Sequence, residues 1–324
     1  MKRIERYNKT DLNDANDNVF DLSEPRLEKL KKSIKEKTLI LFWGAGLSRI
    51  AGCESWQGLS NNVINGLTPS ILNYSESDEL KKLSILDVRK VLTICRKLAD
   101  ANGKIEDFNK LIIKSVKPKN YQLFKEVHEL LLEIKAYAYI TTNIDKGMEE
   151  ARPKFESPQD IYDLTKEIPS KISSLINNGN IFYLHGSIDN ISTSIFNNEN
   201  YFSFYDKHEI KELLKDIFSG RFTVLFIGYG LGDYEILTNI FLAAKENNYT
   251  KTISHYSLMP MFSNELNRIS IEERYLEVFS ICPLFYYIDY SNYESILPIL
   301  YKFRDVVNEI RSPRMEDLDL IDSV

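Results

Sequence analysis

The stretch Thr38-Leu39-Ile40-Leu41-Phe42-Trp43-Gly44-Ala45-Gly46-Leu47-Ser48-Arg49 decides the fold class. Its first six residues form a short apolar run, which is typical of a strand that is buried on both faces of a parallel sheet. Gly44-Ala45-Gly46 then predicts a tight turn, and Ser48 predicts the start of a helix. A buried strand that leads through glycines into a helix is the repeating unit of an α/β fold.

Four further apolar runs have the same character as the first. They lie at Tyr137–Thr142, Ile181–Leu184, Thr223–Ile227 and Leu284–Ile288. Segments with helical periodicity at 207–218, at 234–246 and from 293 to 311 lie between or after them. This alternation predicts a Rossmann-like parallel sheet that is covered by helices on both faces.

The segment from 57 to 135 interrupts this alternation, because it shows helical periodicity and no strand-like run. We therefore expect an inserted all-helical module at about 57–135, within an α/β domain that spans 24–311. Residues 1–23 are polar and predict an N-terminal arm, whereas 312–324 predict an acidic tail. A length of 324 residues agrees with one large domain that carries an insertion, or with two domains.

Composition excludes several classes of protein. The 47 acidic and 41 basic residues give a net charge of −6, so nothing attracts the chain generally to nucleic acid or to an anionic membrane. A hydrophobic content of 43% excludes an intrinsically disordered chain. No apolar run approaches the ~20 residues that cross a bilayer, and the N-terminus lacks the apolar core of a signal peptide. Cys53, Cys95 and Cys282 form no CxxC pair, which argues against a zinc site and for a reduced, cytoplasmic, metal-free protein.

The first glycine turn, Gly44-Ala45-Gly46-Leu47-Ser48, has two interpretations. Glycines let a backbone approach a phosphate closely, and the N–H groups at the start of the next helix can donate to it. The dinucleotide fingerprint G-x-G-x-x-G needs glycine at position 49, where this chain has arginine, and no Gly-Lys-Ser/Thr follows for a P-loop. Taken alone, the turn is equally compatible with nucleotide binding and with a simple connection between strand and helix.

Three more clusters follow predicted strands: Thr141-Thr142-Asn143-Ile144-Asp145, Leu184-His185-Gly186-Ser187 and Gly228-Tyr229-Gly230-Leu231-Gly232-Asp233. Asn143 and Asp145 can hydrogen-bond sugar hydroxyls or a water, or else cap a turn. His185 can accept a proton near neutral pH, although a single histidine is more often a packing residue. The last cluster offers a second backbone cradle, and Asp233 can cap the next helix. Because ligands bind beyond the carboxyl ends of parallel strands, we expect all four clusters to line one crevice.

In this order the four clusters resemble those of the sirtuin-like family, from about Lys37 to Glu246. The resemblance implies that the chain binds NAD. It places the pyrophosphate at Gly44, Ala45, Gly46 and Ser48, the nicotinamide ribose at Asn143 and Asp145, and the adenosine half near Gly228, Gly230 and Asp233, with Thr142 as a further NAD-binding residue. By the same resemblance His185 acts on ribose hydroxyls or water, so that Asn143, Asp145 and His185 are the expected catalytic residues.

The chain departs from the protein deacylases of this family in two places. It has no four-cysteine zinc module, and Ala51-Gly52-Cys53-Glu54-Ser55-Trp56 stands where the deacylases carry a G-I-P-D-F-R loop. Trp56 either covers the site or packs against the helical module. The chain is more similar to the zinc-free sirtuin domains of bacterial antiphage defence, including the Thoeris effectors, which Tyr201 and the form of the last turn also resemble. This resemblance implies hydrolysis of NAD to nicotinamide and ADP-ribose in abortive infection, with NAD as substrate and no zinc.

Two other functions stay open at this stage. One is an NAD-dependent protein deacylase, which the missing cysteines argue against. The other is a non-catalytic module that senses NAD or ADP-ribose, which would not need His185. A dehydrogenase is disfavoured by Arg49 in the first turn.

Control of such an activity is expected to come from outside the chain, because no second ligand domain is recognisable in the sequence. We expect a homo-oligomer or a separately encoded activator. The resemblance suggests a HerA-like ATPase, an Argonaute-type module or a phage protein as that activator. No membrane partner and no direct contact with nucleic acid are expected.

Overall fold

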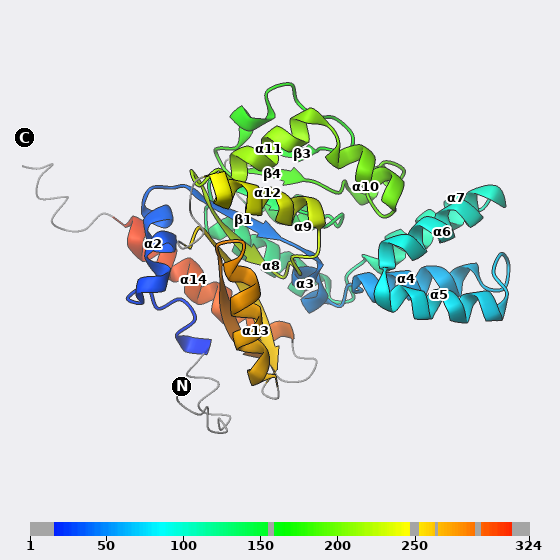
Figure 1. The fold of residues 1–324 in the computed structure, drawn as a ribbon, viewed down its shortest axis with the longest axis horizontal. Helices are drawn as coiled ribbons and strands as arrows, with labels where there is room; N and C mark the ends of the chain where they lie inside the picture. Colours follow the sequence, from blue (N-terminus) through cyan, green and yellow to red (C-terminus); the bar gives the residue numbers. More distant parts are fainter. Residues whose placement is uncertain (1–15, 155–158, 247–252, 263–264, 289–292, 313–324) are drawn as a thin grey trace, which may run out of the picture.

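The computed structural model describes residues 16–154, 159–246, 253–262, 265–288 and 293–312. Their centre is a seven-stranded sheet in which every pair of neighbouring strands is parallel, in the order β3-β4-β2-β1-β5-β6-β7 (Figure 1). The strands are β1 (Leu39–Trp43), β2 (Ala138–Thr141), β3 (Ile161–Asp163), β4 (Asn180–Tyr183), β5 (Thr223–Ile227), β6 (His255–Phe262) and β7 (Ile281–Ile288). The predicted α/β, Rossmann-like parallel sheet is confirmed.

Strand β1 lies in the middle of the sheet, between β2 and β5. Each of its residues is buried, which is why the run reads as continuously apolar. Trp43, the last residue of β1, is level with Thr141 of β2 and Ile227 of β5, so the three strands end at one edge. The chain builds β2, β3 and β4 on one side of β1 and then crosses to start β5 on the other. This reversal of strand order opens a crevice at the carboxyl ends of β1 and β5.

Helices cover both faces of the sheet, as the sequence predicted (Figure 1). One face packs against α2 (Glu28–Lys35), α8 (Tyr121–Glu133), α9 (Gly147–Ala151) and α14 (Ile296–Arg311). The other face packs against α10 (Asn198–Tyr205), α11 (His208–Phe218), α12 (Tyr234–Glu246) and α13 (Leu266–Glu277). The short helix α3 (Ala45–Ser48) follows β1 directly.

Four helices form a lobe beside the sheet: α4 (Trp56–Leu67), α5 (Tyr74–Leu86), α6 (Val88–Ala101) and α7 (Ile105–Ser115). This inserted lobe projects to one side of the molecule (blue to cyan in Figure 1). It has an apolar core of its own, in which Val63, Leu92 and Phe108 are almost fully buried. Helix α8 is different, because Val127 and Leu131 on it pack under the sheet. The projecting lobe thus consists of α4 to α7, whereas α8, which also lies in the interval 57–135, packs against the sheet.

Strands β3 and β6 and helix α13 were not predicted from the sequence. Strand β3 has only three residues, and β6 contains Pro260, which obscures a strand pattern because proline cannot donate to a strand ladder. Part of the predicted N-terminal arm packs on the domain, since Phe20 stacks on Phe303 of α14 with ring centroids 4.3 Å apart. Residues 1–15 of that arm and 313–324 of the predicted tail lie outside the described residues.

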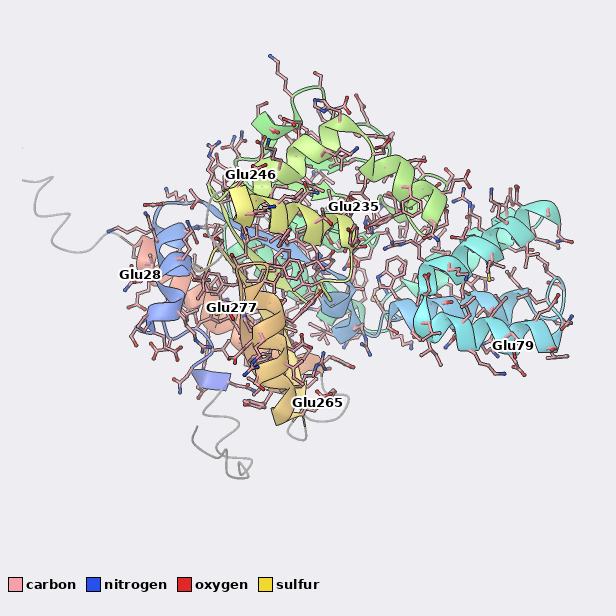
Figure 2. The ribbon with its side chains drawn as sticks, in the orientation of Figure 1. Glu28, Glu79, Glu235, Glu246, Glu265 and Glu277 are labelled. Carbon is pink, nitrogen blue, oxygen red and sulfur yellow. The ribbon has the colours of Figure 1, made fainter. Side chains whose placement is uncertain are left out.

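Glutamates of α2, α5, α12 and α13 point outward around the molecule (Figure 2). Within the described parts of the chain, no helix has the length and apolarity needed to cross a membrane.

Candidate active site

The four predicted clusters follow β1, β2, β4 and β5, and they meet at one edge of the sheet. Two connected cavities lie there. An outer cleft of ≈ 650 Å³ runs between the two glycine turns and the inserted lobe, with Gly46, Gly230 and Arg89 in its walls. An inner pocket of ≈ 40 Å³ lies beside it, with Ser48, Asn143 and Asp145 in its wall. Ala45, Trp56 and Thr142 line both, so the inner pocket continues the outer cleft.

The two glycine turns pack against each other at the crevice. The Gly44 N–H donates to the Ile227 carbonyl at 3.2 Å, and the Gly46 N–H donates to the Gly228 carbonyl at 2.8 Å. A Cβ on Gly46 would lie 2.6 Å from the Gly228 oxygen, so only glycine allows this approach. Gly228 also has φ of 57°, which favours glycine. The glycines therefore let the two turns pack directly against each other, and we call this contact between Gly46 and Gly228 the seam. Gly230 does not take part in it and is open to the cleft.

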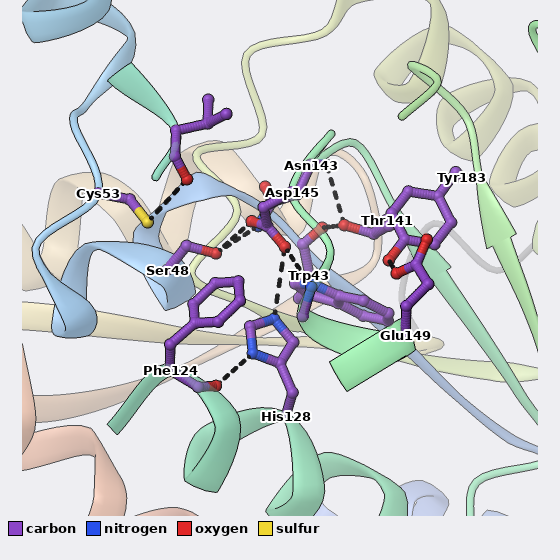
Figure 3. Close-up of polar contacts among 12 residues, drawn as sticks. Trp43, Ser48, Cys53, Phe124, His128, Thr141, Asn143, Asp145, Glu149 and Tyr183 are labelled. Atoms are coloured by element: carbon purple, nitrogen blue, oxygen red, sulfur yellow. Dashed lines mark hydrogen bonds and ion pairs between the residues drawn. The ribbon is translucent and has the colours of Figure 1, made fainter. Parts of the chain in front are cut away.

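Ser48, Asn143 and Asp145 form a hydrogen-bonded network in the wall of the inner pocket (Figure 3). The Ser48 hydroxyl donates to Asp145 Oδ2 at 2.6 Å. Asn143 Nδ2 donates to Ser48 Oγ at 2.9 Å and to Asp145 Oδ2 at 3.1 Å. Because a carboxylate only accepts, these contacts fix which end of the Asn143 amide is the donor. Asn143 Oδ1 then has no hydrogen bond to any described residue and is available as an acceptor.

The backbone of the second cluster is held by the ends of two strands. Thr141 Oγ1 donates to the Trp43 carbonyl at 3.1 Å and accepts from the Asn143 N–H at 2.9 Å. These contacts turn the chain sharply after β2 and place Asn143 and Asp145 beside α3. Thr142 lines both cavities with only 6% of its surface exposed.

The second carboxylate oxygen of Asp145 faces away from Ser48. Asp145 Oδ1 accepts from the Gly147 N–H at 3.1 Å, and His128 Nε2 of α8 lies 3.7 Å from it. His128 is fully buried, and its Nδ1 lies 2.7 Å from the Phe124 carbonyl, so Nδ1 is the donor of the ring. Both carboxylate oxygens of Asp145 therefore accept hydrogen bonds from the protein, and Asp145 Oδ2 joins Ser48 and Asn143. No motif or spacing in the sequence singles out His128.

His185 lies at the end of β4, but it lines neither cavity. It is 2% exposed, and its Nε2 is 2.9 Å from the Tyr205 hydroxyl. Its Nδ1 is buried without a hydrogen-bond partner among the described residues. Burial lowers the pKa of His185 to about 4, which the Arg89 charge also favours and the Asp233 carboxylate opposes. The imidazole is therefore neutral at neutral pH.

A chain of aromatic and charged contacts joins His185 to the inserted lobe. The Tyr205 ring lies 4.6 Å from the Tyr201 ring, measured between centroids. The Arg89 guanidinium of α6 stacks 3.7 Å above Tyr201 and forms an ion pair of 2.8 Å with Asp233. Burial raises the pKa of Tyr205 well above its usual value, so the hydroxyl stays protonated. The Asp233 carboxylate thus accepts a hydrogen bond from Arg89 and, at 2.6 Å, another from the Tyr229 hydroxyl.

Sequence reasoning singled out Tyr201 but missed Tyr205 and Arg89. Neither belongs to a recognisable motif, and both depend on how α6 and α10 pack. Trp56 is 38% exposed, lines both cavities and lies 6.4 Å from the Phe196 ring, so it takes part in the cover and in the packing of the lobe. Within the described ranges, no group of three or more His, Cys, Asp and Glu residues is arranged to hold a metal ion.

Comparison with known families gives a match to the SIR2-like domain over residues 137–284. This match includes the second, third and fourth clusters. The chain is therefore similar to SIR2-like domains over this part of its sequence. The first glycine turn precedes the matched part of the SIR2-like domain but completes the same crevice, because β1 lies beside β2 in the sheet.

Three curated bacterial proteins are similar to this chain. "NAD(+) hydrolase ThsA" of Cytobacillus dafuensis is 24% identical over 224 residues, which cover 66% of this chain and 39% of the relative. The protein of the same name from Enterococcus faecium is 24% identical over 241 residues, 72% of this chain and 45% of the relative. "Defense-associated sirtuin 2" of Bacillus subtilis is 24% identical over 220 residues, 65% of this chain and 20% of the relative.

The chain spans less than half the length of each of these relatives. The domain match and the names of the relatives confirm the predicted resemblance to sirtuin-like proteins of bacterial antiphage defence.

Proposed function

We propose that this chain is an NAD⁺ glycohydrolase that splits NAD into nicotinamide and ADP-ribose. The observation that carries this proposal is the Ser48–Asn143–Asp145 network, which leaves Asn143 Oδ1 as a fixed acceptor in a residue that lines the inner pocket. The similarity to two proteins named NAD(+) hydrolase supports the same substrate.

The reaction breaks the bond between the nicotinamide nitrogen and C1′ of the ribose. The leaving group is a cation before the bond breaks, and the electron pair of that bond neutralises its nitrogen. The transition state resembles an oxocarbenium ion, as in other glycosidic cleavages. A water molecule forms the new bond to C1′ and loses one proton. The site therefore has to hold the ribose, orient the water and receive the proton.

Each of these tasks has a candidate residue. Asn143 Oδ1 accepts a hydrogen bond from the attacking water or from a ribose hydroxyl. Asp145 keeps Ser48 and Asn143 in place, since both of its oxygens are already bonded within the protein. The resemblance assigns receipt of the proton to His185, which is neutral because burial lowers its pKa to about 4, but which lines neither cavity, so in this proposal the proton reaches it indirectly.

The outer cleft supplies the rest of the dinucleotide site in this proposal. Its ≈ 650 Å³ is within the ~300–1,000 Å³ that small-molecule sites occupy. Gly44, Ala45 and Gly46 lie next to the phosphates. Gly228, Gly230 and Asp233 lie toward the adenosine, and Thr142 lies where the two cavities join.

The biological role that we propose is depletion of cytoplasmic NAD during antiphage defence, as an abortive infection. Such an activity has to be silent in a healthy cell. We propose that assembly into a homo-oligomer, or contact with a separately encoded partner such as a HerA-like ATPase, an Argonaute-type module or a phage protein, switches it on. Residues 16–23 and α14, which pack together through Phe20 and Phe303, form a candidate contact surface.

The test is incubation of the purified protein with NAD over a range of protein concentrations, followed by chromatography for nicotinamide and ADP-ribose. Asn143→Ala and His185→Ala are expected to abolish release of both products. His208→Ala, an exposed histidine on α11, is the matched control and is expected to retain full turnover. Undiminished turnover by Asn143→Ala or by His185→Ala would overturn the assignment. Light scattering of the same samples tests whether turnover follows assembly.

A further inference from the structure

A dinucleotide brings two phosphate charges to the outer cleft, and the first glycine turn offers them few free donors. The N–H groups of Gly44, Gly46 and Leu47 already donate to backbone carbonyls of the two turns, at 3.2, 2.8 and 3.0 Å. Helix α3, which follows, has only four residues and therefore little dipole to contribute. A cationic side chain in this cleft would therefore add to the backbone donors that remain, which include those of the second glycine turn.

Two arginines are the basic side chains among the described residues that line the outer cleft. Arg49 follows α3, and its guanidinium lies 4.3 Å above the Tyr293 ring. It has no hydrogen bond or ion pair with any described residue, so no polar contact fixes the direction of its charge. Arg89 comes from α6 of the inserted lobe, on the opposite wall.

Arg89 is held from two sides. Its guanidinium stacks 3.7 Å above Tyr201, and its Nη2 donates to Asp233 Oδ1 at 2.8 Å. The remaining N–H donors of the guanidinium bond to no described residue, and the side chain is 32% exposed. A guanidinium that is already oriented and still has free donors loses little entropy when it binds an anion.

We propose that Arg89 binds the pyrophosphate of the dinucleotide from the inserted lobe, and that Asp233 is its counter-ion when no phosphate is bound. This inference rests on the proposed function for the class of ligand. It makes the lobe a part of the substrate site, because α6 then contacts the phosphates directly. Asp233 then weakens phosphate binding, because its carboxylate competes with the phosphate for the Arg89 guanidinium.

Binding of ADP-ribose and of adenosine, each measured by isothermal titration calorimetry, tests the inference. Arg89→Gln is expected to weaken ADP-ribose binding about 10- to 100-fold, the range for a hydrogen bond to a charged group. Adenosine binding is expected to stay unchanged, because adenosine has no phosphate. The dependence of the ADP-ribose Kd on salt is expected to become shallower.

Two further variants sharpen the test. Arg96→Gln is the matched control, because Arg96 also links α6 to the sheet domain, at 3.4 Å from the Ser192 carbonyl, but does not line the cleft. It is expected to bind ADP-ribose as the wild type does. Asp233→Asn is expected to bind ADP-ribose more tightly, because it removes the competing charge and keeps the size of the side chain.

The results separate this inference from the proposed function. Equal ADP-ribose binding by Arg89→Gln and wild type would overturn the role of Arg89, and so would an equal loss of ADP-ribose and adenosine binding, which indicates a displaced lobe. A wild-type protein that binds ADP-ribose but releases no nicotinamide from NAD would overturn the hydrolase proposal alone. A wild-type protein that binds neither NAD nor ADP-ribose would overturn both.

Discussion

Replacement of Gly46 by alanine tests the seam between the two glycine turns. The new Cβ would lie 2.6 Å from the Gly228 oxygen and 2.9 Å from the Gly228 Cα, where ordinary contact begins at 3.4 Å. Both atoms belong to the backbone, so no side chain can rotate to make room. The turns would have to separate, and the hydrogen bond of 2.8 Å from the Gly46 N–H to the Gly228 carbonyl would be lost or lengthened.

The size of the effect follows from these two losses. Insertion of a methyl group into a tightly packed site costs about 1–3 kcal/mol. A lost backbone hydrogen bond costs about 1 kcal/mol more. We therefore expect Gly46→Ala to lower the free energy of unfolding by about 2–4 kcal/mol. ADP-ribose binding is expected to fall as well, because the turns form one wall of the outer cleft.

Urea denaturation of Gly46→Ala beside Gly232→Ala checks this reasoning. Gly232 belongs to the second glycine turn, which also contains Gly228, but a Cβ there would meet no atom within 4 Å. Gly232→Ala is expected to leave stability unchanged or to raise it by up to about 1 kcal/mol, because alanine restricts the unfolded chain. If the two variants unfold at the same urea concentration, the seam does not depend on glycine and the argument fails.

Three other predictions concern the buried polar groups. Burial lowers the pKa of His185 to about 4 and of His255 to about 3, so between these values and ~6.5 the unfolded chain binds more protons and stability falls as the pH falls. We expect the free energy of unfolding to fall by about 2 kcal/mol per histidine between about pH 7 and pH 5. Urea denaturation curves that coincide at the two pH values would refute this expectation. Ser48→Ala removes the hydroxyl that donates to Asp145 and accepts from the Asn143 amide. We expect NAD turnover to fall about 10-fold or more in a product assay, while the circular dichroism spectrum stays unchanged. Tyr205→Phe leaves both ring nitrogens of His185 without a partner and is expected to cost about 1–3 kcal/mol in urea denaturation, whereas wild-type stability would show that the bond contributes nothing.

The sheet and its crevice could be predicted because their signals are local. A continuous apolar run such as 38–43 is required wherever a strand is buried on both faces, and glycine is required where two turns touch. The order of the four clusters along the chain then carried the resemblance to sirtuin-like proteins. Strand β6 escaped prediction because Pro260 interrupts its pattern, and pairing with β5 and β7 stabilises it regardless.

The contacts around the site could not be predicted, because they join residues from separate elements. Nothing near Arg89 in the sequence indicates that α6 packs across Tyr201 and Asp233. His128 likewise reaches Asp145 only because α8 packs under the sheet rather than in the lobe. The enclosure of His185 by Tyr205 depends on the fold of α10 over the third cluster. Such long-range contacts leave no periodic pattern in the sequence.

The pairing of β1 with β5 has a consequence for synthesis of the protein. Leu39 pairs with Thr223, so the strand that supplies the second wall of the outer cleft leaves the ribosome long after the first. A growing chain can pack the inserted lobe and β2 against β1, but the seam between Gly46 and Gly228 cannot form until β5 has emerged. Nascent or prematurely terminated chains therefore lack the cleft. The activity that we propose is thus absent until β5 has been synthesised.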